Sequence, residues 1–314
     1  MKNLPELLSE YIKLRRSLGF KLFKTEWLLN KFISFLEEQG QVYITTNVAL
    51  NWATLPQNSQ PATWARRLSI VRLFSEYCFV NDTRNEIPSK NLLPHKYNRK
   101  EPYIYSDQEV LNIIEGAKNL NSKIGLRPYT YSVLFGLLSV TGMRIQEVTD
   151  LNQKDVNLDE GLITIQQTKF RKSRIIPIHK STRKKLEQYI SKRDNILGKA
   201  SSNSFFLSDS GTRLSTSTVR SNFVKVSCEI GLRKPSKSHG YGPRLHDFRH
   251  RFAVKTIINW YKTGCDVQRE ITKLATYLGH THVSDTYWYL SAVPELMQLA
   301  SKRLEIEAGG GHNE

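Results

Sequence analysis

Cysteine is scarce in this 314-residue sequence, which has only Cys78, Cys228 and Cys265. The three lie far apart and in no spacing typical of a metal site, so neither a disulfide framework nor a cysteine-rich zinc site is expected. Long apolar runs are also lacking, since none reaches the roughly 18 residues that a transmembrane helix needs. Residues 1–20 lack the apolar core of a signal peptide. We therefore expect reduced thiols in a cytoplasmic protein with no membrane segment.

Acidic residues are in short supply as well. Asp and Glu total 29 against 46 Lys and Arg, which gives a formal net charge of +17. Basic side chains bind a polyanion favourably because they release its counterions. Hydrophobic residues make up 39% of the chain, which is enough for packed cores and unlike a disordered composition. The balance favours a nucleic acid as partner over a merely solvated basic surface, but charge alone says nothing about catalysis.

The first 88 residues have the pattern of a small helical domain. Apolar side chains recur at helical spacing through residues 4–39, which we divide into two helices ending before Gly40. A short third helix begins with Thr46 or Asn47 as its cap, and a fourth covers residues 62–80. The fourth helix mixes an apolar stripe with three basic residues, Arg66, Arg67 and Arg72. Its basic side is either an ordinary wet face or a surface for the DNA backbone.

Periodicity breaks down in residues 89–105, which are basic and contain Pro94 and Pro102. We interpret this stretch as an extended linker between two domains. Ser106 and Glu109 have the spacing of a capping box, so a helix and the second domain begin there. The second domain is expected to cover residues 106–308, with a flexible tail over 309–314.

The second domain is expected to be mainly helical. A nearly continuous apolar helix over residues 129–140 is interrupted by a glycine, and Arg144 then opens another helix. Residues 162–168 and 173–179 are rich in Ile and Thr and predict a β-hairpin whose tip carries Lys169 and Lys172. Further helices are expected over residues 182–196, 218–231, 245–261 and 266–278. The fold class is therefore mainly α with a small antiparallel β-sheet, in two domains.

The segment 274–290 is predicted to form two short helices with a break. Gly279 is placed where a helix C-cap belongs, because glycine tolerates the left-handed backbone that ends a helix. Ser284 is expected to cap the next helix. His280 lies in the break, and Tyr289 follows nine residues later. The break allows both side chains to face one point, which suggests phosphate chemistry with a tyrosine nucleophile.

A second motif places His246 and Arg249 three residues apart on one helix face. An arginine there can fork onto a phosphate while a histidine moves a proton. A zinc pair formed by His246 and His250 is an alternative, but Asp247 stands where the zinc-protease motif needs glutamate. A purely structural histidine is the third possibility. Taken singly, Arg144, the hairpin lysines and Tyr289 also have ordinary structural explanations.

Taken together, the order of these residues resembles the tyrosine recombinase (phage integrase) family. The resemblance covers nearly all of residues 105–290. It rests on four stretches that are similar to family motifs: Thr141-Gly-Met-Arg-Ile-Gln-Glu-Val148, Arg174-Ile-Ile-Pro-Ile178, His246-Asp-Phe-Arg-His250, and Leu278-Gly-His280 followed by Tyr289. Residues 1–88 resemble the family's helical DNA-clamping domain only in size, position and helicity.

The resemblance implies a mechanism. Tyr289 attacks a DNA phosphorus, forms a 3′-phosphotyrosyl link and releases a 5′-hydroxyl. Arg144, Arg249 and His280 hold the non-bridging oxygens, with Glu147 supporting Arg144. Lys169 protonates the leaving oxygen and His246 acts as the base for the tyrosine. No cofactor, ATP or metal is implied. The hairpin tip lacks the glycine-flanked lysine of many relatives, so Lys172 stays an alternative to Lys169.

The resemblance also implies partners: double-stranded DNA with specific recombination sites, a homotetramer on that DNA, and a monomer when free. An apolar helix over residues 292–306 is expected to contact a neighbouring subunit. Pro294 can start this helix and Ser291 can cap it. A nucleoid-associated location in the cytoplasm follows. Two alternatives stay open, namely DNA relaxation by a type IB topoisomerase and a DNA-binding protein without catalysis. The DNA target, its directionality and the biological role are not readable from the sequence.

Overall fold

A computed structural model of the chain describes residues 2–94, 101–166, 173–198, 202–235 and 242–309. The chain divides into two compact units, Met1–Lys100 and Glu101–Glu314. The division falls inside the stretch expected to be a linker. Tyr105, which we placed in that linker, is buried in the core of the second unit.

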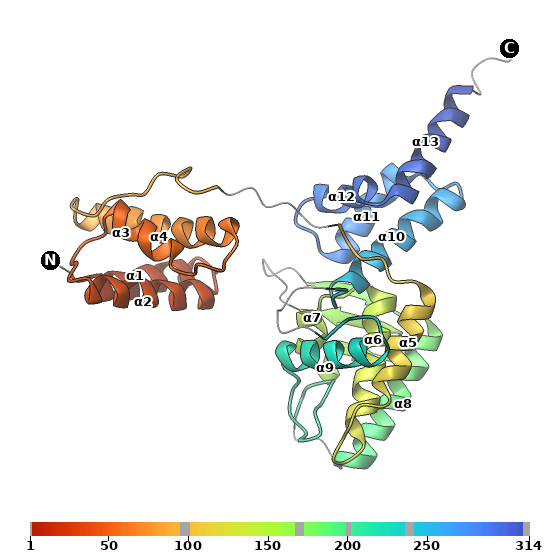
Figure 1. Ribbon diagram of the computed structural model, residues 1–314. Helices are drawn as coiled ribbons and strands as arrows, with labels where there is room; N and C mark the ends of the chain where they lie inside the picture. The colour runs from red at the N-terminus through yellow and green to blue at the C-terminus, as the bar shows by residue number, and fades with distance from the viewer. Residues whose placement is uncertain (1, 95–100, 167–172, 199–201, 236–241, 310–314) are drawn as a thin grey trace. The chain divides into compact units, whose positions relative to one another are not determined.

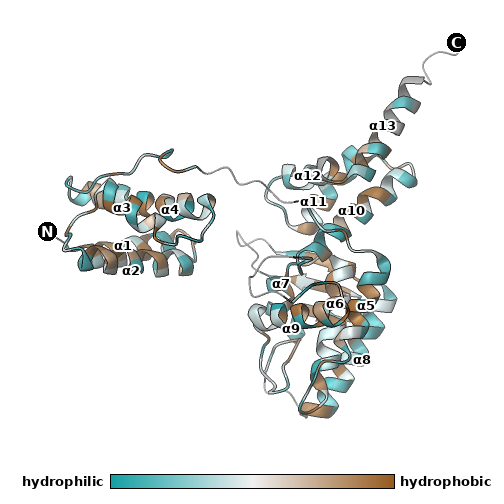
Figure 2. Cartoon of the chain, viewed as in Figure 1, coloured by the Kyte–Doolittle hydropathy of each residue, from teal (hydrophilic) through white to brown (hydrophobic). Residues whose placement is uncertain are grey.

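The first unit is a four-helix domain (Figure 1). Its helices are α1 (Leu4–Ser17), α2 (Phe23–Glu38), α3 (Thr46–Thr54) and α4 (Pro61–Asn81). Local chemistry favours the start of two of them: Asn3 and Glu6 form a capping box on α1, and α4 starts with a proline, which lacks the N–H that a first turn would leave without a partner. The cap of α3 is Thr45, not Thr46 or Asn47 as expected. Figure 2 shows hydrophobic and hydrophilic residues alternating along these helices, as one buried side requires.

The second unit holds nine of the helices that the described residues form, together with a small sheet. The helices are α5 (Asp107–Ala117), α6 (Leu126–Thr141), α7 (Ile145–Asp150), α8 (Lys180–Leu197), α9 (Thr216–Glu229), α10 (Asp247–Lys262), α11 (Val267–Leu278), α12 (Ser284–Ala292) and α13 (Pro294–Gly309). The antiparallel sheet has the order β1 (Val156–Asn157), β2 (Leu162–Ile165) and β3 (Arg174–Pro177). The expected hairpin corresponds to β2 and β3, and β1 was not foreseen because two residues carry no periodicity. The mainly helical class with a small antiparallel sheet is confirmed.

Two hydrophobic cores build the second unit. The larger one is formed mostly by α5, α6, α8, α9 and the sheet, and the smaller one by α10 to α13. Helix α10 takes part in both, since Phe248 lies in the first and Val254 in the second. Helix α10 therefore joins the two cores, and its first turns lie where they meet.

Two further predicted caps are wrong. Val283, not Ser284, precedes α12, and its backbone is already helical, so no side chain caps this helix. Ser291 belongs to α12 itself, and the short connection to α13 is Val293. Gly279 does end α11 with φ of 67°, and Pro294 does open α13, as expected.

The C-terminal helix is partly covered by its own unit. Val293 and Leu296 are buried in the smaller core, whereas Met297 is 56% exposed. Figure 1 shows the far end of α13 projecting away from α10 and α12. Its expected range of 292–306 becomes 294–309, and residues 310–314 of the expected tail lie outside the described residues. Among the described helices, none is long and apolar enough to cross a membrane.

Candidate active site

The end of α6 places the first arginine. Gly142 ends this helix with φ of 61°, and a Cβ there would meet the ring of Phe252 at 2.7 Å. Glycine is therefore needed both for the left-handed backbone and for the close approach of α10. The chain then turns so that Arg144 stands at the N-cap of α7. Its backbone N–H and its Nη1 both donate to the carboxylate of Glu147, each at 2.9 Å.

Glu147 also pairs with a second arginine, which comes from the sheet. Arg174 at the start of β3 donates to both oxygens of Glu147, at 3.0 and 2.7 Å, and its Nε donates to the carbonyl of Tyr277. Burial tends to raise the pKa of Glu147. The hydrogen bond and charge of Arg174, with those of Arg144, outweigh burial and hold that pKa below its usual value. One buried carboxylate thus fixes two guanidinium groups, and the pairing of Arg144 with Glu147 is confirmed.

Arg249 comes from the first turn of α10. It is 1% exposed and donates to the carbonyls of Gly142 and Leu278, at 2.9 and 2.5 Å. Burial, together with the charge of Arg144, lowers the pKa of Arg249 to about 9. The two carbonyls end α6 and α11, so Arg249 ties the ends of both helices to α10.

The break between α11 and α12 completes the cluster of positive charge. Arg144 donates to the carbonyl of Gly279 at 2.9 Å, and a Cβ on this glycine would lie 2.8 Å from Nη1 of Arg174. The backbone N–H of His280 bonds to Ala275, which closes the end of α11. The His280 ring then reaches forward to the hydroxyl of Thr286, 2.7 Å from its Nδ1. Three guanidinium groups and one carboxylate therefore surround this break, which leaves a net positive site for an anion.

Tyr289 lies on the second turn of α12. The side chain is 1% exposed, and its hydroxyl oxygen is 2.9 Å from Nδ1 of His250 on α10. His246 stands just before α10, is exposed, and has its ring centroid 4.7 Å from that of His250. The histidine next to the tyrosine hydroxyl is therefore His250, with His246 one ring further out.

The structure brings together most of the residues singled out in the sequence. Arg144 and Arg249 meet at the end of α11, next to His280 in the break, while Tyr289 and His246 both contact His250. Lys169 and its alternative Lys172 lie outside the described residues.

Two contributors to the site were missed. Arg174 was noted only as the start of a strand, and His250 only as a possible zinc ligand. The signal for Arg174 was a charged residue opening an otherwise apolar strand. Among the described residues, no group of three or more His, Cys, Asp or Glu side chains could hold a metal ion.

A short segment ahead of α5 is fastened to α10, and we call residues 103–107 the strap. The Tyr105 ring stacks on Phe248 with centroids 4.8 Å apart, and its hydroxyl donates to the carbonyl of Arg244 at 2.9 Å. Arg251 donates to the carbonyl of Tyr105 and pairs with Asp107. The contacts of Phe248 and Arg251 fall on the turns of α10 that carry Arg249 and His250, so the strap supports the end of the helix that faces the arginine cluster.

The fold and this cluster define a class of protein that transfers DNA strands through a tyrosine. The sequence profile of the phage integrase family matches residues 104–295, more than half of the chain. A putative integrase/recombinase of Sinorhizobium fredii, y4rB, is 43% identical over 309 residues, covering 97% of this chain and 98% of the relative. The chain therefore belongs to the phage integrase family and is a tyrosine site-specific recombinase.

Two further comparisons agree with this assignment. Tyrosine recombinase XerC of Chlamydia caviae is 26% identical, with 83% of this chain and 85% of the relative covered. The structure of the Tn1549 transposon integrase in complex with transposon right end DNA has a TM-score of 0.65 at 14% identity, covering 98% of this chain and 99% of that one. At that identity the likeness concerns the fold alone.

Proposed function

We propose that this recombinase cuts and rejoins double-stranded DNA at specific sites through a 3′-phosphotyrosyl link on Tyr289. The observation that carries the proposal is the convergence of Arg144, Arg174 and Arg249 on the end of α11, one short break before the helix that bears the tyrosine. A pentavalent phosphate transition state gains negative charge on its non-bridging oxygens. Fixed guanidinium groups stabilise that charge without having to reorganise during the reaction.

The roles divide by position. Arg144 is one-third exposed and Arg249 is buried, so Arg144 meets the phosphate from the solvent side while Arg249 anchors the floor of the site. His280 and the exposed His246 complete the oxygen contacts. Arg174 acts through Glu147, which it holds in place for Arg144. The proposed reaction conserves the energy of the phosphodiester bond and uses no cofactor.

The general acid for the leaving 5′-oxygen is proposed to be Lys169. The choice of Lys169 over Lys172 follows the resemblance of the hairpin to that of the family, and both lysines lie outside the described residues. Lys169→Ala should slow cleavage at least 100-fold, whereas Lys172→Ala should have a much smaller effect. A 5′-phosphorothiolate substrate, whose leaving sulfur needs no proton, should restore the Lys169 variant. Restoration of the Lys172 variant alone would reverse the assignment.

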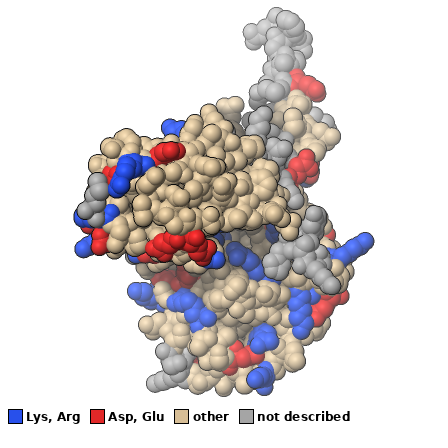
Figure 3. All heavy atoms as spheres, turned by 60° about the vertical axis from the view of Figure 1, so that its left-hand side comes forward, with Lys and Arg blue, Asp and Glu red and all other residues tan. Residues whose placement is uncertain are grey.

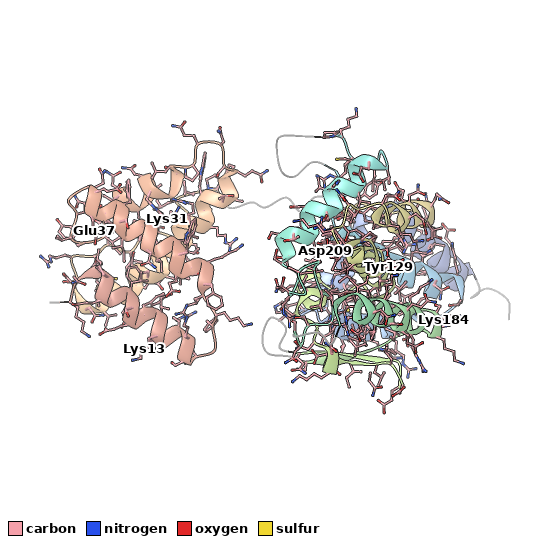
Figure 4. All side chains as sticks on the ribbon, turned by 90° about the horizontal axis from the view of Figure 1, so that it is seen from below. Lys13, Lys31, Glu37, Tyr129, Lys184 and Asp209 are labelled. Carbon is pink, nitrogen blue, oxygen red and sulfur yellow. The ribbon has the colours of Figure 1, made fainter. Side chains whose placement is uncertain are left out.

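DNA binding is proposed to involve the first unit as well. Trp27 on α2 lines two adjoining surface hollows, and Arg67 on α4 lines both. Arg67 donates to the carbonyl of Trp52 and lies over its ring, and Lys31 lies over the ring of Trp27 with its Nζ 4.1 Å from the centroid. Arg66 lines one of the two hollows beside them. Lys31 is marked in Figure 4. The basic side of α4 thus supports the interpretation as a DNA surface, with Arg66 as its contact to phosphate.

The second unit also carries Lys and Arg side chains on its surface. On the face that Figure 3 shows, its Lys and Arg side chains are scattered and not gathered in one place. A scattered excess of positive charge favours general attraction to a polyanion, which raises the rate of encounter. We place the protein on the nucleoid in the cytoplasm, because its proposed substrate is duplex DNA.

Assembly as a tetramer on DNA is proposed, because two duplexes have to be cut in order by copies that sense one another. The exposed Met297 and the projecting end of α13 support a contact with a neighbouring subunit, which a cyclic arrangement would close. A chain that ends after Ser301 keeps Val293 and Leu296 in their own core. It should still bind one site but fail to form the higher-order complex on two sites, as measured by native gel shift.

A chain that ends after Leu290 is the matched comparison. It loses the buried Val293 and Leu296 and should unfold at lower temperature, which separates a folding defect from an assembly defect. If the chain ending after Ser301 recombines two sites as well as the full chain does, α13 contacts only its own unit and the assembly proposal is wrong.

The proposed chemistry is tested by trapping on nicked suicide substrates made from candidate sites in the flanking DNA. Loss of the short 5′-hydroxyl fragment leaves the protein covalently attached to the DNA. A band of protein joined to DNA on a denaturing gel shows the activity, and the substrate that yields this band identifies the target. Relaxation of supercoils by a monomer without two-site products would favour the topoisomerase alternative. Specific binding without covalent attachment would favour a DNA-binding protein that lacks catalysis.

A further inference from the structure

We infer that His250 is the residue that takes the proton from Tyr289 when the tyrosine attacks, and returns it when the strand is rejoined. The inference rests on the proposed function and assigns the base within it. His246 was the expected base, and the geometry points to its neighbour one helical turn further along.

Contact between the two side chains is direct. Nδ1 of His250 lies 2.9 Å from the hydroxyl oxygen of Tyr289, and the ring centroids are 5.5 Å apart at an edge-to-face angle. Both side chains are buried, and Trp288 packs against the same imidazole with a centroid distance of 5.7 Å. A general base has to be within hydrogen-bond reach of the proton that it removes, and His250 meets that condition. Its packing leaves the ring little freedom to turn away.

The surroundings of His250 suit an imidazole that becomes charged. When the tyrosine hydroxyl donates to Nδ1, the ring hydrogen lies on Nε2, and Nε2 is 3.9 Å from Oδ1 of Asp247. That carboxylate is held by the backbone N–H and a guanidinium N–H of Arg244, at 2.6 and 3.0 Å. The distance from Asp247 is too long for a hydrogen bond, but a nearby negative charge stabilises the imidazolium that proton transfer creates. Asp247 therefore supports the charged form of the base without touching the nucleophile.

A nearby positive charge also stabilises the phenolate form of Tyr289. Arg249 precedes His250 on α10, and the charge of the ionised Tyr289 oxygen interacts favourably with its guanidinium. His246 differs because it is exposed, and its ring packs edge-to-face against that of His250. The two histidines thus divide the work: His250 faces the nucleophile, and His246 faces the solvent side where DNA arrives.

Two protons move in the proposed reaction, one at the tyrosine and one at the 5′-oxygen. In cleavage the O–H proton of Tyr289 moves to Nδ1 of His250, the tyrosine oxygen bonds to phosphorus, and the bond from phosphorus to the 5′-oxygen breaks. The 5′-oxygen takes its proton from the general acid assigned to Lys169. In rejoining the 5′-hydroxyl attacks and gives its proton to that lysine, the bond from phosphorus to the tyrosine oxygen breaks, and His250 returns its proton to that oxygen.

Burial of Tyr289 is compatible with this role. The ring shares its core with Val293 and Leu296, at the start of the C-terminal helix, whereas His250 belongs to α10. In cleavage the hydroxyl has to meet the phosphate, so its cover by the residues around Val293 and Leu296 has to be relieved while the contact with His250 is kept. The hydrogen bond to His250 then sets the direction of the O–H bond during attack.

The experiment compares His250→Ala, His250→Gln and His246→Ala in the full chain, on a suicide substrate under single-turnover conditions. His250→Ala should form the covalent complex about 100-fold more slowly than wild type, and added imidazole should restore much of the rate by filling the space of the lost ring. His250→Gln preserves much of the volume and can accept the hydrogen bond but takes no proton, so it should be folded, bind DNA normally and remain slow. His246→Ala should be slow without any response to imidazole.

Several results would overturn the assignment. Cleavage by His250→Gln within about threefold of wild type would show that proton transfer to this residue is not needed. Rescue of His246→Ala by imidazole, or failure of imidazole to accelerate His250→Ala, would also remove His250 from the proton path. Failure of the proposed function looks different, because then the wild-type chain itself forms no covalent complex, or Tyr289→Phe still forms one.

Discussion

Replacing Tyr289 by phenylalanine should abolish covalent attachment to DNA while leaving binding nearly intact. The hydroxyl is the proposed nucleophile, and nothing else on the ring can bond to phosphorus. The ring is buried in the core that α10 to α13 share, and phenylalanine fills the same space. The loss to folding is the hydrogen bond to His250, about 1 kcal/mol. Suicide-substrate trapping should therefore fall to background, while a gel shift on the same site should change little.

Tyr287 provides the matched control for this result. It lies two residues earlier on α12 and is 45% exposed, so it faces away from the buried position of Tyr289. Tyr287→Phe should cleave at close to the wild-type rate. Covalent complex that survives in Tyr289→Phe and disappears in Tyr287→Phe would move the nucleophile to Tyr287 and contradict the site described here.

Glu147→Gln should cause the largest loss of stability of the substitutions considered. The carboxylate is the shared counter-charge of Arg144 and Arg174, and both it and Arg174 are largely removed from solvent. Glutamine preserves the shape but leaves a buried guanidinium uncompensated, which costs about 3 kcal/mol or more. The midpoint of thermal unfolding should fall by several degrees, and cleavage should fall with it because Arg144 loses its support.

The pH dependence gives this prediction an internal check. The pKa of Glu147 is held below its usual value of 4.5, so its charge stabilises the folded chain at neutral pH. That stabilisation is lost as the pH falls through the lowered pKa, because the folded state must then take up a proton. The difference in unfolding midpoint between wild type and Glu147→Gln should therefore shrink in strong acid. Glu115→Gln, which breaks an exposed pair with Lys118, should leave the unfolding midpoint unchanged, and an equal loss in both variants would refute the argument.

Much of the architecture was predictable because local sequence patterns determine where its helices begin and end. Gly142 and Gly279 mark helix ends where the backbone turns left-handed, and Ser106 with Glu109 forms the expected capping box. These features depend on a few neighbouring residues and on backbone geometry. The caps of α3 and α12 were misplaced by one residue, which is the usual uncertainty where a helix begins.

The partners inside the site were harder to predict, because they depend on how distant elements cross. Arg249 and His250 are adjacent, so on a helix they point about 100° apart, and which of them faces α12 is decided only when α10 packs against it. The family resemblance named His246 as the base, and we propose His250 from its contact with Tyr289 across α10 and α12. Arg174 reaches Glu147 and Tyr277, which are 27 and 103 residues away in the chain, and no local pattern announces such contacts.

The strap has a practical consequence for building recombinases with new DNA targets. An exchange of first units between relatives requires a junction, and the change in composition near residue 105 would seem the natural place for one. Tyr105 and Asp107, however, both bond to Arg251 on α10, and Tyr105 also bonds to Arg244 just before that helix. A chimera joined at residue 100 would keep these matched partners together, whereas one joined at residue 106 would pair a foreign tyrosine position with the native helix. Designers should therefore treat residues 103–107 as part of the catalytic half.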